Sequence, residues 1–366
     1  MSAGAAPGQH GLAAHLIAWQ RSHGRHDLPW QGTRDPYRVW LSEIMLQQTQ
    51  VSTMLAYYPR FLARCPDVAA LAAAPLDDVL ALWSGLGYYS RARNLHRCAQ
   101  AVVAEHGSAF PRTAAVLATL PGIGRSTAAA IAAFCFGERV AILDGNVKRV
   151  LTRALGFGDD LAETRHERRL WQIAEGLLPE AGIEAYTQGL MDLGATVCTQ
   201  RRPACGACPW AGLCVARGEG RPEAYPVKTR KLKRSERRSA LLWLTQADRV
   251  WLTQRPATGV WAGLWTLPEW PDVDALQAAT AGWPGQGEVQ PAFKHVLTHL
   301  DWWLQPCRWQ LPDDLTQAMR KPIDQLLAEA APGGRWLRRD EALALGLPAP
   351  IRKLLEIGGQ QALPLS

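Results

Sequence analysis

The chain has 366 residues, of which 40 are Lys or Arg and 33 are Asp or Glu, so its formal net charge is +7. A hydrophobic content of 48% excludes a disordered protein, and no apolar run reaches the roughly 18 residues that a membrane helix needs. The length predicts two or three domains, and the first residues lack the form of a signal peptide. We therefore expect a cytoplasmic protein with no membrane partner.

Helical patterns dominate the chain from residue 12 to residue 225, after an N-terminus (1–11) that is expected to be disordered. Asp35 followed by Pro36 predicts a helix start. The apolar residues that follow recur at helical spacing and predict a core-facing stripe of Tyr37, Trp40, Leu41 and Ile44. Further helices are expected over 76–84, 90–105, 127–136, 147–154, 167–178 and 185–197. This part lacks strand alternation, so we predict an all-α domain.

The composition changes after residue 225. Residues 226–239 hold seven basic residues and one acidic residue, which predicts a linker that is either simply solvated or in contact with DNA. Ten of the sixteen Trp lie beyond residue 240. Strands are expected over 241–245 and 250–253, and a helix over 272–279 with Asp272 as its N-cap. Residues 240–366 are therefore predicted to form an α+β domain.

Four of the eight cysteines are clustered with the spacing Cx6Cx2Cx5C, at Cys198, Cys205, Cys208 and Cys214. Four thiolates within 17 residues fit one tetrahedral all-sulfur site. The spacing alone leaves zinc and an iron-sulfur cluster open. The other four cysteines are predicted to be small buried apolar groups.

The segment from Leu120 to Ala128 reads LPGIGRSTA and lies between two helical patterns. Gly122 and Gly124 allow a tight turn that aims backbone N–H groups outward at the start of the next helix, where a phosphate binds without base specificity. An ordinary helix-helix turn is the alternative. Asp144 follows an apolar run and precedes a helix, so it is an N-cap in the simplest interpretation.

These motifs together resemble the helix-hairpin-helix-Gly/Pro-Asp superfamily of DNA glycosylases, in its iron-sulfur branch. WLSEIMLQQTQV (40–51), GLGYYSRARNL (85–95), ILDGNVKRV (142–150) and MDLGATVC (191–198) are similar to the MutY family of adenine DNA glycosylases. The match covers about residues 28–216, and the second domain resembles the family's C-terminal domain more loosely. The resemblance implies a helical glycosylase domain (12–225) with a 4Fe-4S cluster loop (198–214), a basic linker (226–239) and a Nudix-like domain (240–366).

The implied reaction is hydrolysis of the N-glycosidic bond of adenine paired with 8-oxoguanine or guanine in duplex DNA, by a monomeric base excision repair enzyme. Glu43 would be the general acid that protonates the base, with a pKa raised by partial burial against Trp40. Asp144 would stabilise the oxocarbenium-like sugar or form a transient covalent adduct with it. The pattern alone describes Glu43 as a solvated surface residue. Family likeness assigns Tyr88 and Asn146 to positioning Asp144 and the sugar.

The other implied contacts are with DNA. Trp30, Gln31 and Gln188 would line the base pocket, and Gln48 and Leu86 would enter the duplex from which the adenine is flipped. For Leu86 and Tyr88, plain core packing is the alternative. Hairpin contacts are implied for Gly122, Gly124 and Ser126.

Ser126 stands where the strand-cutting glycosylases of the superfamily carry a nucleophilic Lys. Since a hydroxyl cannot form a Schiff base, we expect a monofunctional enzyme. The alternatives are a bifunctional glycosylase and lyase for oxidised pyrimidines and a non-catalytic iron-sulfur damage sensor. Retention of Glu43 and Asp144 argues against a sensor.

In the second domain, Thr298 and His299 are implied to contact 8-oxoguanine. Leu297-Thr298-His299 replaces the family's usual Phe-Ser-His, which keeps the hydroxyl but changes the aromatic residue. The metal-binding box of Nudix hydrolases is missing from the sequence, so nucleotide hydrolysis is not expected.

Overall fold

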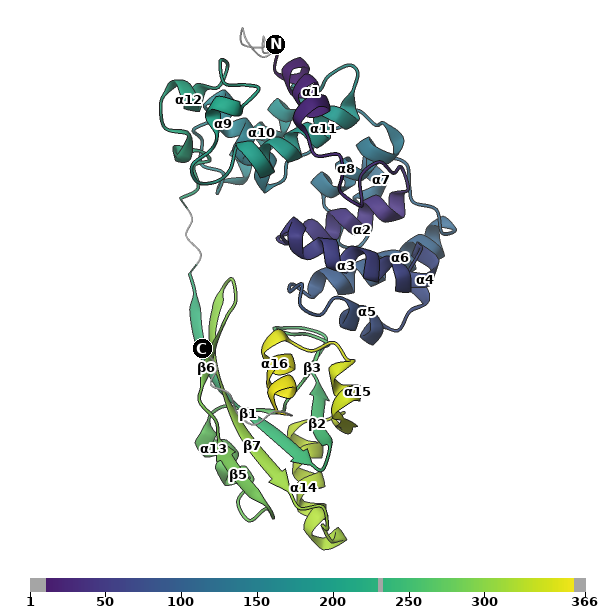
Figure 1. The fold of residues 1–366 in the computed structure, drawn as a ribbon, viewed down its shortest axis with the longest axis vertical. Coiled ribbons are helices and arrows are strands. Elements are labelled where there is room, and N and C mark those ends of the chain that lie inside the picture. Colours follow the sequence, from purple (N-terminus) through teal and green to yellow (C-terminus); the bar gives the residue numbers. More distant parts are fainter. Residues whose placement is uncertain (1–10, 230–232, 359–366) are drawn as a thin grey trace. The chain divides into compact units, whose positions relative to one another are not determined.

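The computed structural model describes residues 11–229 and 233–358 (Figure 1). These residues divide into two compact units, 11–72 with 97–229 and 73–96 with 233–358. The second unit thus includes a segment that the sequence assigned to the helical domain. Within this unit, the hydroxyl groups of Ser84 and Tyr89 both donate to the carbonyl oxygen of Leu347, at 3.2 and 3.0 Å.

In its described residues the first unit consists of helices joined by loops, with no strands, as the sequence predicts. Its elements are α1 (Leu12–His23), α2 (Pro36–Leu46), α3 (Val51–Arg64), α4 (Val68–Ala73), α7 (Ala114–Leu117), α8 (Arg125–Phe136), α9 (Gly145–Leu155), α10 (Thr164–Gly176), α11 (Ile183–Asp192), the π-helix η2 (Leu193–Val197), the 3-10 helices η3 (Cys205–Ala207) and η4 (Pro222–Ala224), and α12 (Val215–Gly218). Helix α5 (Leu76–Leu82) belongs to the second unit, and α6 (Ser90–His106) begins there and continues into the first.

The predicted N-caps are confirmed by their hydrogen bonds. Asp35 accepts from the N–H of Tyr37 at 2.9 Å, with Pro36 in the first turn of α2. Asp272 caps α13 (Val273–Ala279) through the N–H of Ala275 at 2.8 Å. The apolar stripe of α2 is also confirmed, because all four of its predicted residues are buried. A carboxylate that accepts from an otherwise unpaired N–H fixes where each of these helices begins.

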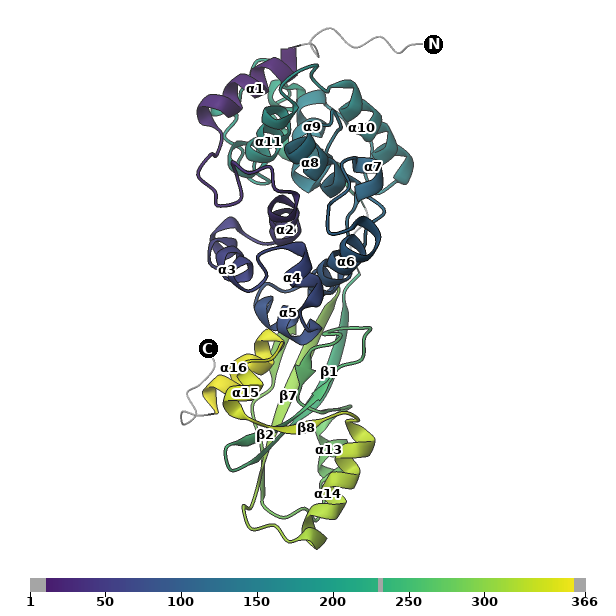
Figure 2. The ribbon, with the colours of Figure 1, turned by 90° about the vertical axis from the view of Figure 1, so that its right-hand side faces the viewer.

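The core of the first unit forms where α1, α8, α9, α10 and α11 meet. Helix α8 is buried on all sides over a run of small residues, Ala128–Ala133 with Ile131 among them. Small side chains let neighbouring helices approach α8 closely, so α8 lies at the centre of the unit. Figure 2 shows α9, α10 and α11 gathered beside it.

The second unit is built on a mixed sheet. Its strands are β1 (Ser235–Gln246), β2 (Arg249–Gln254), β3 (Trp265–Thr266), β4 (Glu269–Trp270), β5 (Gln286–Val289), β6 (Phe293–Val296), β7 (Leu300–Leu311) and β8 (Arg335–Arg338). The main path is β3-β2-β1-β7-β5, while β4 pairs with β1, β6 with β7 and β8 with β2. The long strands β1 and β7 run parallel from Ser235 opposite Leu300 to Gln246 opposite Leu311, and the other pairs are antiparallel.

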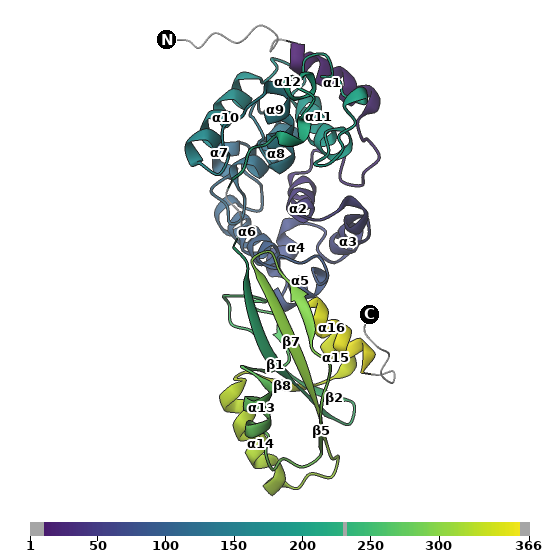
Figure 3. The same ribbon diagram turned by 90° about the vertical axis from the view of Figure 1, so that its left-hand side faces the viewer.

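Helices cover both faces of this sheet, as Figure 3 shows. Leu242 and Leu244 of β1 pack with Ile323 and Leu327 of α14 (Gln317–Ala330) and with α13. The opposite face is adjacent to α15 (Arg339–Leu343) and α16 (Ala349–Ile357), where Trp243 lies against Gly358. Successive residues of β1 therefore face opposite layers, as strand geometry requires. The predicted α+β domain is confirmed.

The structure differs from the predicted linker at its C-terminal side. Strand β1 begins at Ser235, so residues 235–239 of the predicted linker pair with β7 instead of connecting the domains. Their charged side chains stay exposed while their backbone completes the sheet, and a charge pattern gives no information about backbone pairing. Arg234 and Arg237 form ion pairs with Asp301 and Glu269. Arg230 and Lys231 lie outside the described residues, as does most of the N-terminus predicted to be disordered.

In the described residues, no helix combines the length and the apolar character needed to cross a membrane.

Leu151 provides a test of the first unit's core. It is fully buried in α9, so Leu151→Ala leaves a cavity and should lower the free energy of unfolding by about 2 to 5 kcal/mol. Leu55 on α3 is 44% exposed, so Leu55→Ala is the matched control and should change stability by about 0.5 kcal/mol or less. Denaturant unfolding followed by circular dichroism measures both, and equal losses would contradict this core assignment.

Candidate active site

A cavity of about 860 Å³ opens in the first unit among α2, the loop over residues 24–34, the start of α9 and one face of α11. It brings together seven of the residues selected from the sequence. These are Trp30, Gln31, Glu43, Ser126, Asp144, Asn146 and Gln188. Residues from five separate segments therefore converge on one concave site, which is the usual form of a ligand or active site.

Glu43 is the residue whose ionisation this cavity changes most. It lies on α2 beside the fully buried Trp40 and is itself only partly exposed. Burial first, and then the negative charge of Asp144, together raise the pKa of Glu43 from 4.5 to about 8. The carboxyl group is thus protonated at neutral pH. The interpretation of Glu43 as a solvated surface residue is wrong, and the expected rise in its pKa is confirmed.

Asp144 is held by its own helix and by the hairpin. Its Oδ1 accepts from the N–H of Val147 at 2.7 Å, which makes it the predicted N-cap of α9. The hydroxyl of Ser126 accepts from the N–H of Leu143 at 3.0 Å, one residue before Asp144. The cavity therefore holds the protonated carboxyl group of Glu43 together with the side chain of Asp144 that caps α9.

Asn146 is held by Arg149, which lies about one turn further along α9. Its Oδ1 accepts from Nη2 of Arg149 at 2.9 Å, and the same guanidinium donates to the carbonyl oxygens of Gly194 and Cys198 at 2.7 and 2.8 Å. A Cβ at Gly194 would lie 2.8 Å from the Cβ of Asn146, so only glycine permits this close approach. Arg149 thus joins the cavity to the cysteine-rich loop.

Of the two hairpin glycines, only one adopts the unusual φ that the sequence predicts for the turn. Gly122 adopts φ of +76°, whereas Gly124 is extended and is the N-cap residue of α8. Both are exposed, and adding a Cβ at Gly124 meets no neighbouring atom. No side-chain hydrogen bond from the N-cap residue caps the start of α8.

The remaining predicted DNA-contacting residues lie elsewhere. Gln48 is exposed with φ of +56°, next to cavity residues at the end of α2, and Leu86 is buried at 7% exposure, as its packing interpretation expects. Tyr88 belongs to the second unit, where its hydroxyl lies 3.0 Å from Oγ1 of Thr298. Thr298 and His299 are exposed in the turn between β6 and β7. Their assigned roles stay predictions.

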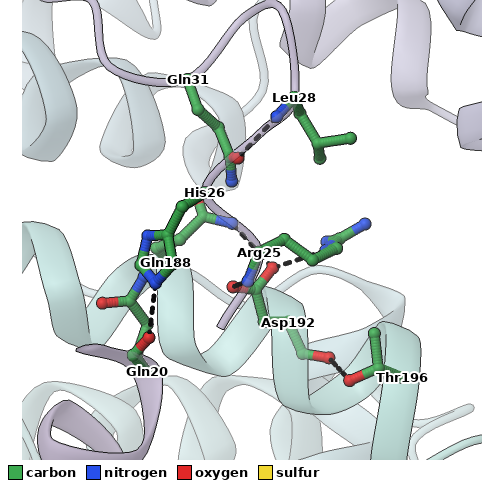
Figure 4. A network of polar contacts seen from close by, with 8 residues as sticks. All are labelled: Gln20, Arg25, His26, Leu28, Gln31, Gln188, Asp192 and Thr196. Atoms are coloured by element: carbon green, nitrogen blue, oxygen red, sulfur yellow. Dashed lines mark hydrogen bonds and ion pairs between the residues drawn. The ribbon is translucent and has the colours of Figure 1, made fainter. Parts of the chain in front are cut away.

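The sequence argument missed several polar residues of the cavity. Glu184 lies four residues before the predicted Gln188, on the same face of α11, a signal that helical periodicity offers. Arg25 and His26 come from an irregular loop, where no pattern marks them. His26 Nε2 lies 3.0 Å from the carbonyl oxygen of Gln20, and Arg25 forms an ion pair with Asp192 (Figure 4).

The four clustered cysteines line one small cavity together with Arg153. Arg153 is buried, and its Nη1 donates to Sγ of Cys198 at 3.4 Å and to the carbonyl oxygen of Thr199 at 2.6 Å. Across the described residues, no group of three or more His, Cys, Asp or Glu side chains is arranged to hold a metal ion.

Two family models match the chain. One describes the HhH-GPD superfamily base excision DNA repair proteins and matches residues 41–175, and the other describes the NUDIX domain and matches residues 239–357. The first match lies within the helical domain, and the second spans most of the mixed α/β domain.

Curated relatives match over nearly the full length. The adenine DNA glycosylase of Buchnera aphidicola subsp. Acyrthosiphon pisum (strain APS) is 33% identical over 93% of this chain and 95% of its own length. The adenine DNA glycosylase of Mus musculus is 34% identical over 94% of this chain and 77% of its own. Among solved structures, a thermostable thymine-DNA glycosylase is 28% identical with a TM-score of 0.52, covering 58% of this chain and 97% of that one.

The raised pKa of Glu43 predicts a stability effect with a definite sign. Folding favours the protonated form, so the wild type loses stability as pH rises from about 4.5 to about 8, whereas Glu43→Gln has no proton to lose. We expect the stability of Glu43→Gln relative to the wild type to rise by about 2 to 4 kcal/mol across this range. Denaturant unfolding at each pH measures the difference.

The control is Glu180→Gln, since Glu180 is an exposed carboxylate of the same unit. Its relative stability should change by less than about 0.5 kcal/mol over the same pH range. A Glu43→Gln difference that is independent of pH would show that the carboxyl group is already ionised in the folded protein.

Proposed function

The chain belongs to the adenine DNA glycosylase family, and from this we propose that it hydrolyses the N-glycosidic bond of adenine in duplex DNA, the first step of base excision repair. The observation that carries the proposal is the pair Glu43 and Asp144, which share one cavity while Asp144 helps to keep Glu43 protonated. Two carboxyl groups with different protonation states are what acid-assisted glycoside cleavage requires.

In the proposed reaction the adenine leaves the base stack and enters the cavity. Glu43 gives its proton to the base at N7, and the bond between C1′ and N9 breaks with its electron pair going to N9. Asp144 stabilises the positive charge that develops on the deoxyribose. A water molecule then adds to C1′, and its proton passes to the carboxylate that Glu43 has become, which restores the enzyme.

We propose that the enzyme is monofunctional. The Ser126 hydroxyl is already engaged as an acceptor for the N–H of Leu143, so this position supports the loop that carries Asp144. A hydroxyl cannot form the Schiff base on which strand cleavage by β-elimination depends. The alternative of a bifunctional lyase needs an amine nucleophile at this place, which the sequence does not provide.

The mispairs that we propose as substrates are adenine opposite 8-oxoguanine and adenine opposite guanine. The second unit would read the damaged base through Thr298 and His299, since both side chains are exposed at the tip of the β6–β7 turn. Thr298 retains the hydroxyl of the family's usual serine. Gln48 would enter the opened duplex and Tyr88 would help to position the sugar, and both are exposed with a positive φ, a strained conformation that is common at functional sites.

We also propose that Cys198, Cys205, Cys208 and Cys214 hold a 4Fe-4S cluster, because all four line one cavity and thiolates are the ligands of such clusters. When bound, the cluster would cross-link this loop and keep Arg201 and Arg202 in place for a phosphate. Arg149 and Arg153, which hydrogen-bond the loop's backbone, would keep its start fixed to α9.

The function is tested by single-turnover release of free adenine from duplexes containing each mispair. We expect release without strand breakage until alkali is added. Asp144→Asn should lower the rate by a factor of about 1,000 or more while DNA binding is retained. Full activity of Asp144→Asn would contradict the mechanism, and strand cleavage without alkali in a clean preparation would contradict monofunctionality.

The cluster is tested by metal analysis and visible absorbance of the purified protein. About four iron atoms per chain are expected, with loss of iron in Cys208→Ala. Cys98→Ala is the matched control because Cys98 is a buried thiol of α6 outside the cluster loop, and it should keep its iron. Stoichiometric zinc in place of iron would contradict the assignment.

A further inference from the structure

Two glutamines of the cavity have their side-chain amides fixed in opposite senses. Oε1 of Gln31 accepts from the N–H of Leu28 at 3.2 Å. Nε2 of Gln188 donates to Oδ1 of Asp192 at 2.8 Å. A backbone N–H can only donate and a carboxylate can only accept, so the partners determine which end of each amide is which. Gln31 therefore has its NH2 group available, and Gln188 has its carbonyl oxygen available.

Asp192 is built into the protein as a fixed acceptor (Figure 4). Its side chain is completely buried, and it accepts from the N–H and the Nε of Arg25, at 3.0 and 2.8 Å, in addition to the bond from Gln188. Its position four residues after Gln188 on α11 places the two side chains on one helix face. The ion pair with Arg25 keeps this carboxylate ready to accept the amide hydrogen of Gln188.

We propose that Asp192, acting through Gln188, sets the hydrogen-bonding polarity of the base pocket and so makes it selective for adenine. This inference rests on the proposed function, because it assumes that adenine enters this cavity. The edge of adenine that a flipped-base enzyme reads carries an amino donor beside a ring-nitrogen acceptor. The carbonyl oxygen of Gln188 matches the amino group, and the NH2 group of Gln31 matches the ring nitrogen.

A 6-oxopurine presents the reverse pattern, with an oxygen acceptor beside an N–H donor. It would face the Gln188 oxygen with an oxygen and the Gln31 amide with an N–H group, which leaves buried polar groups unpaired on both sides. Sites built to hydrogen-bond one edge reject the mismatched edge strongly for this reason. Rotating the Gln188 amide would remove the mismatch on its own side, and the carboxylate of Asp192 prevents that rotation. Asp192 is thus a positioning residue for specificity.

The test compares release of adenine and of hypoxanthine, a 6-oxopurine, each placed opposite 8-oxoguanine, under single-turnover conditions. In Asp192→Asn the new side chain can offer either an oxygen or an NH2 group to Gln188, so its amide is free to turn. We expect the ratio of adenine to hypoxanthine release rates to fall at least about tenfold. A variant that is merely partly misfolded would release both bases more slowly and leave the ratio of the two rates unchanged.

Thr196→Val is the matched control. Oγ1 of Thr196 donates to the backbone oxygen of Asp192 at 2.8 Å, so this variant perturbs the same network without touching the carboxylate. Thr196 is exposed and is not among the cavity-lining residues found in the described chain. The ratio should stay within about twofold of the wild type. A tenfold fall in this control would overturn the inference, because it would trace selectivity to the network in general.

A second variant keeps the inference testable if Asp192→Asn does not fold. Gln188→Met retains the size of the side chain but offers no strong acceptor to the amino group of adenine. Unsubstituted purine lacks that amino group, so the ratio of adenine to purine release rates should fall about tenfold relative to the wild type. An unchanged release ratio in a folded Asp192→Asn, or in Gln188→Met, would overturn this inference. The proposed function would still stand if the wild type releases adenine. No adenine release by the wild type would overturn both.

Discussion

The rest of the site depends on the unequal environments of two carboxyl groups in one cavity. Glu43 comes from the middle of α2 and is packed beside a buried tryptophan, whereas Asp144 stands at a helix N-terminus and accepts a backbone N–H. Burial and the charge of Asp144 act in the same direction on Glu43 and raise its pKa to about 8. The neighbouring charge of Asp144 therefore helps to hold the proton on Glu43, which is the state that the proposed role of general acid requires.

Keeping this arrangement requires that the loop before α9 cannot shift. Three independent contacts act on it, from the hairpin, from the helix itself and from η2. The Ser126 hydroxyl holds Leu143, the N–H of Val147 holds Asp144, and Gly194 allows η2 to pack directly on Asn146. Positioning within a few tenths of an ångström is worth large factors in rate, so this redundancy is chemically useful.

Local signals predicted the parts of the fold that local physics decides. Helix starts at Asp35 and Asp272 followed from capping chemistry, and the buried stripe of α2 followed from its period. The pattern could not predict that Glu43 faces a cavity, because periodicity marks only the apolar face and the pocket is closed by distant segments. The ion pair between Arg25 and Asp192 joins residues 167 positions apart, and no local rule identifies it. The start of β1 was missed because its exposed charges mask a backbone that pairs along its whole length.

A single helical segment connects the requirements of this site. Helix α11 carries Gln188 into the cavity and ends at Asp192, and the π-helix η2 follows at once and ends immediately before Cys198. In a π-helix the hydrogen-bonding ladder shifts by one residue, and such turns are concentrated at functional sites. The shift lets Gly194 meet Asn146 while Cys198 still reaches the cysteine cavity. Gln188, the contact with Asn146 and Cys198 are therefore attached to one continuous stretch of backbone, so a change in its register would disturb all three.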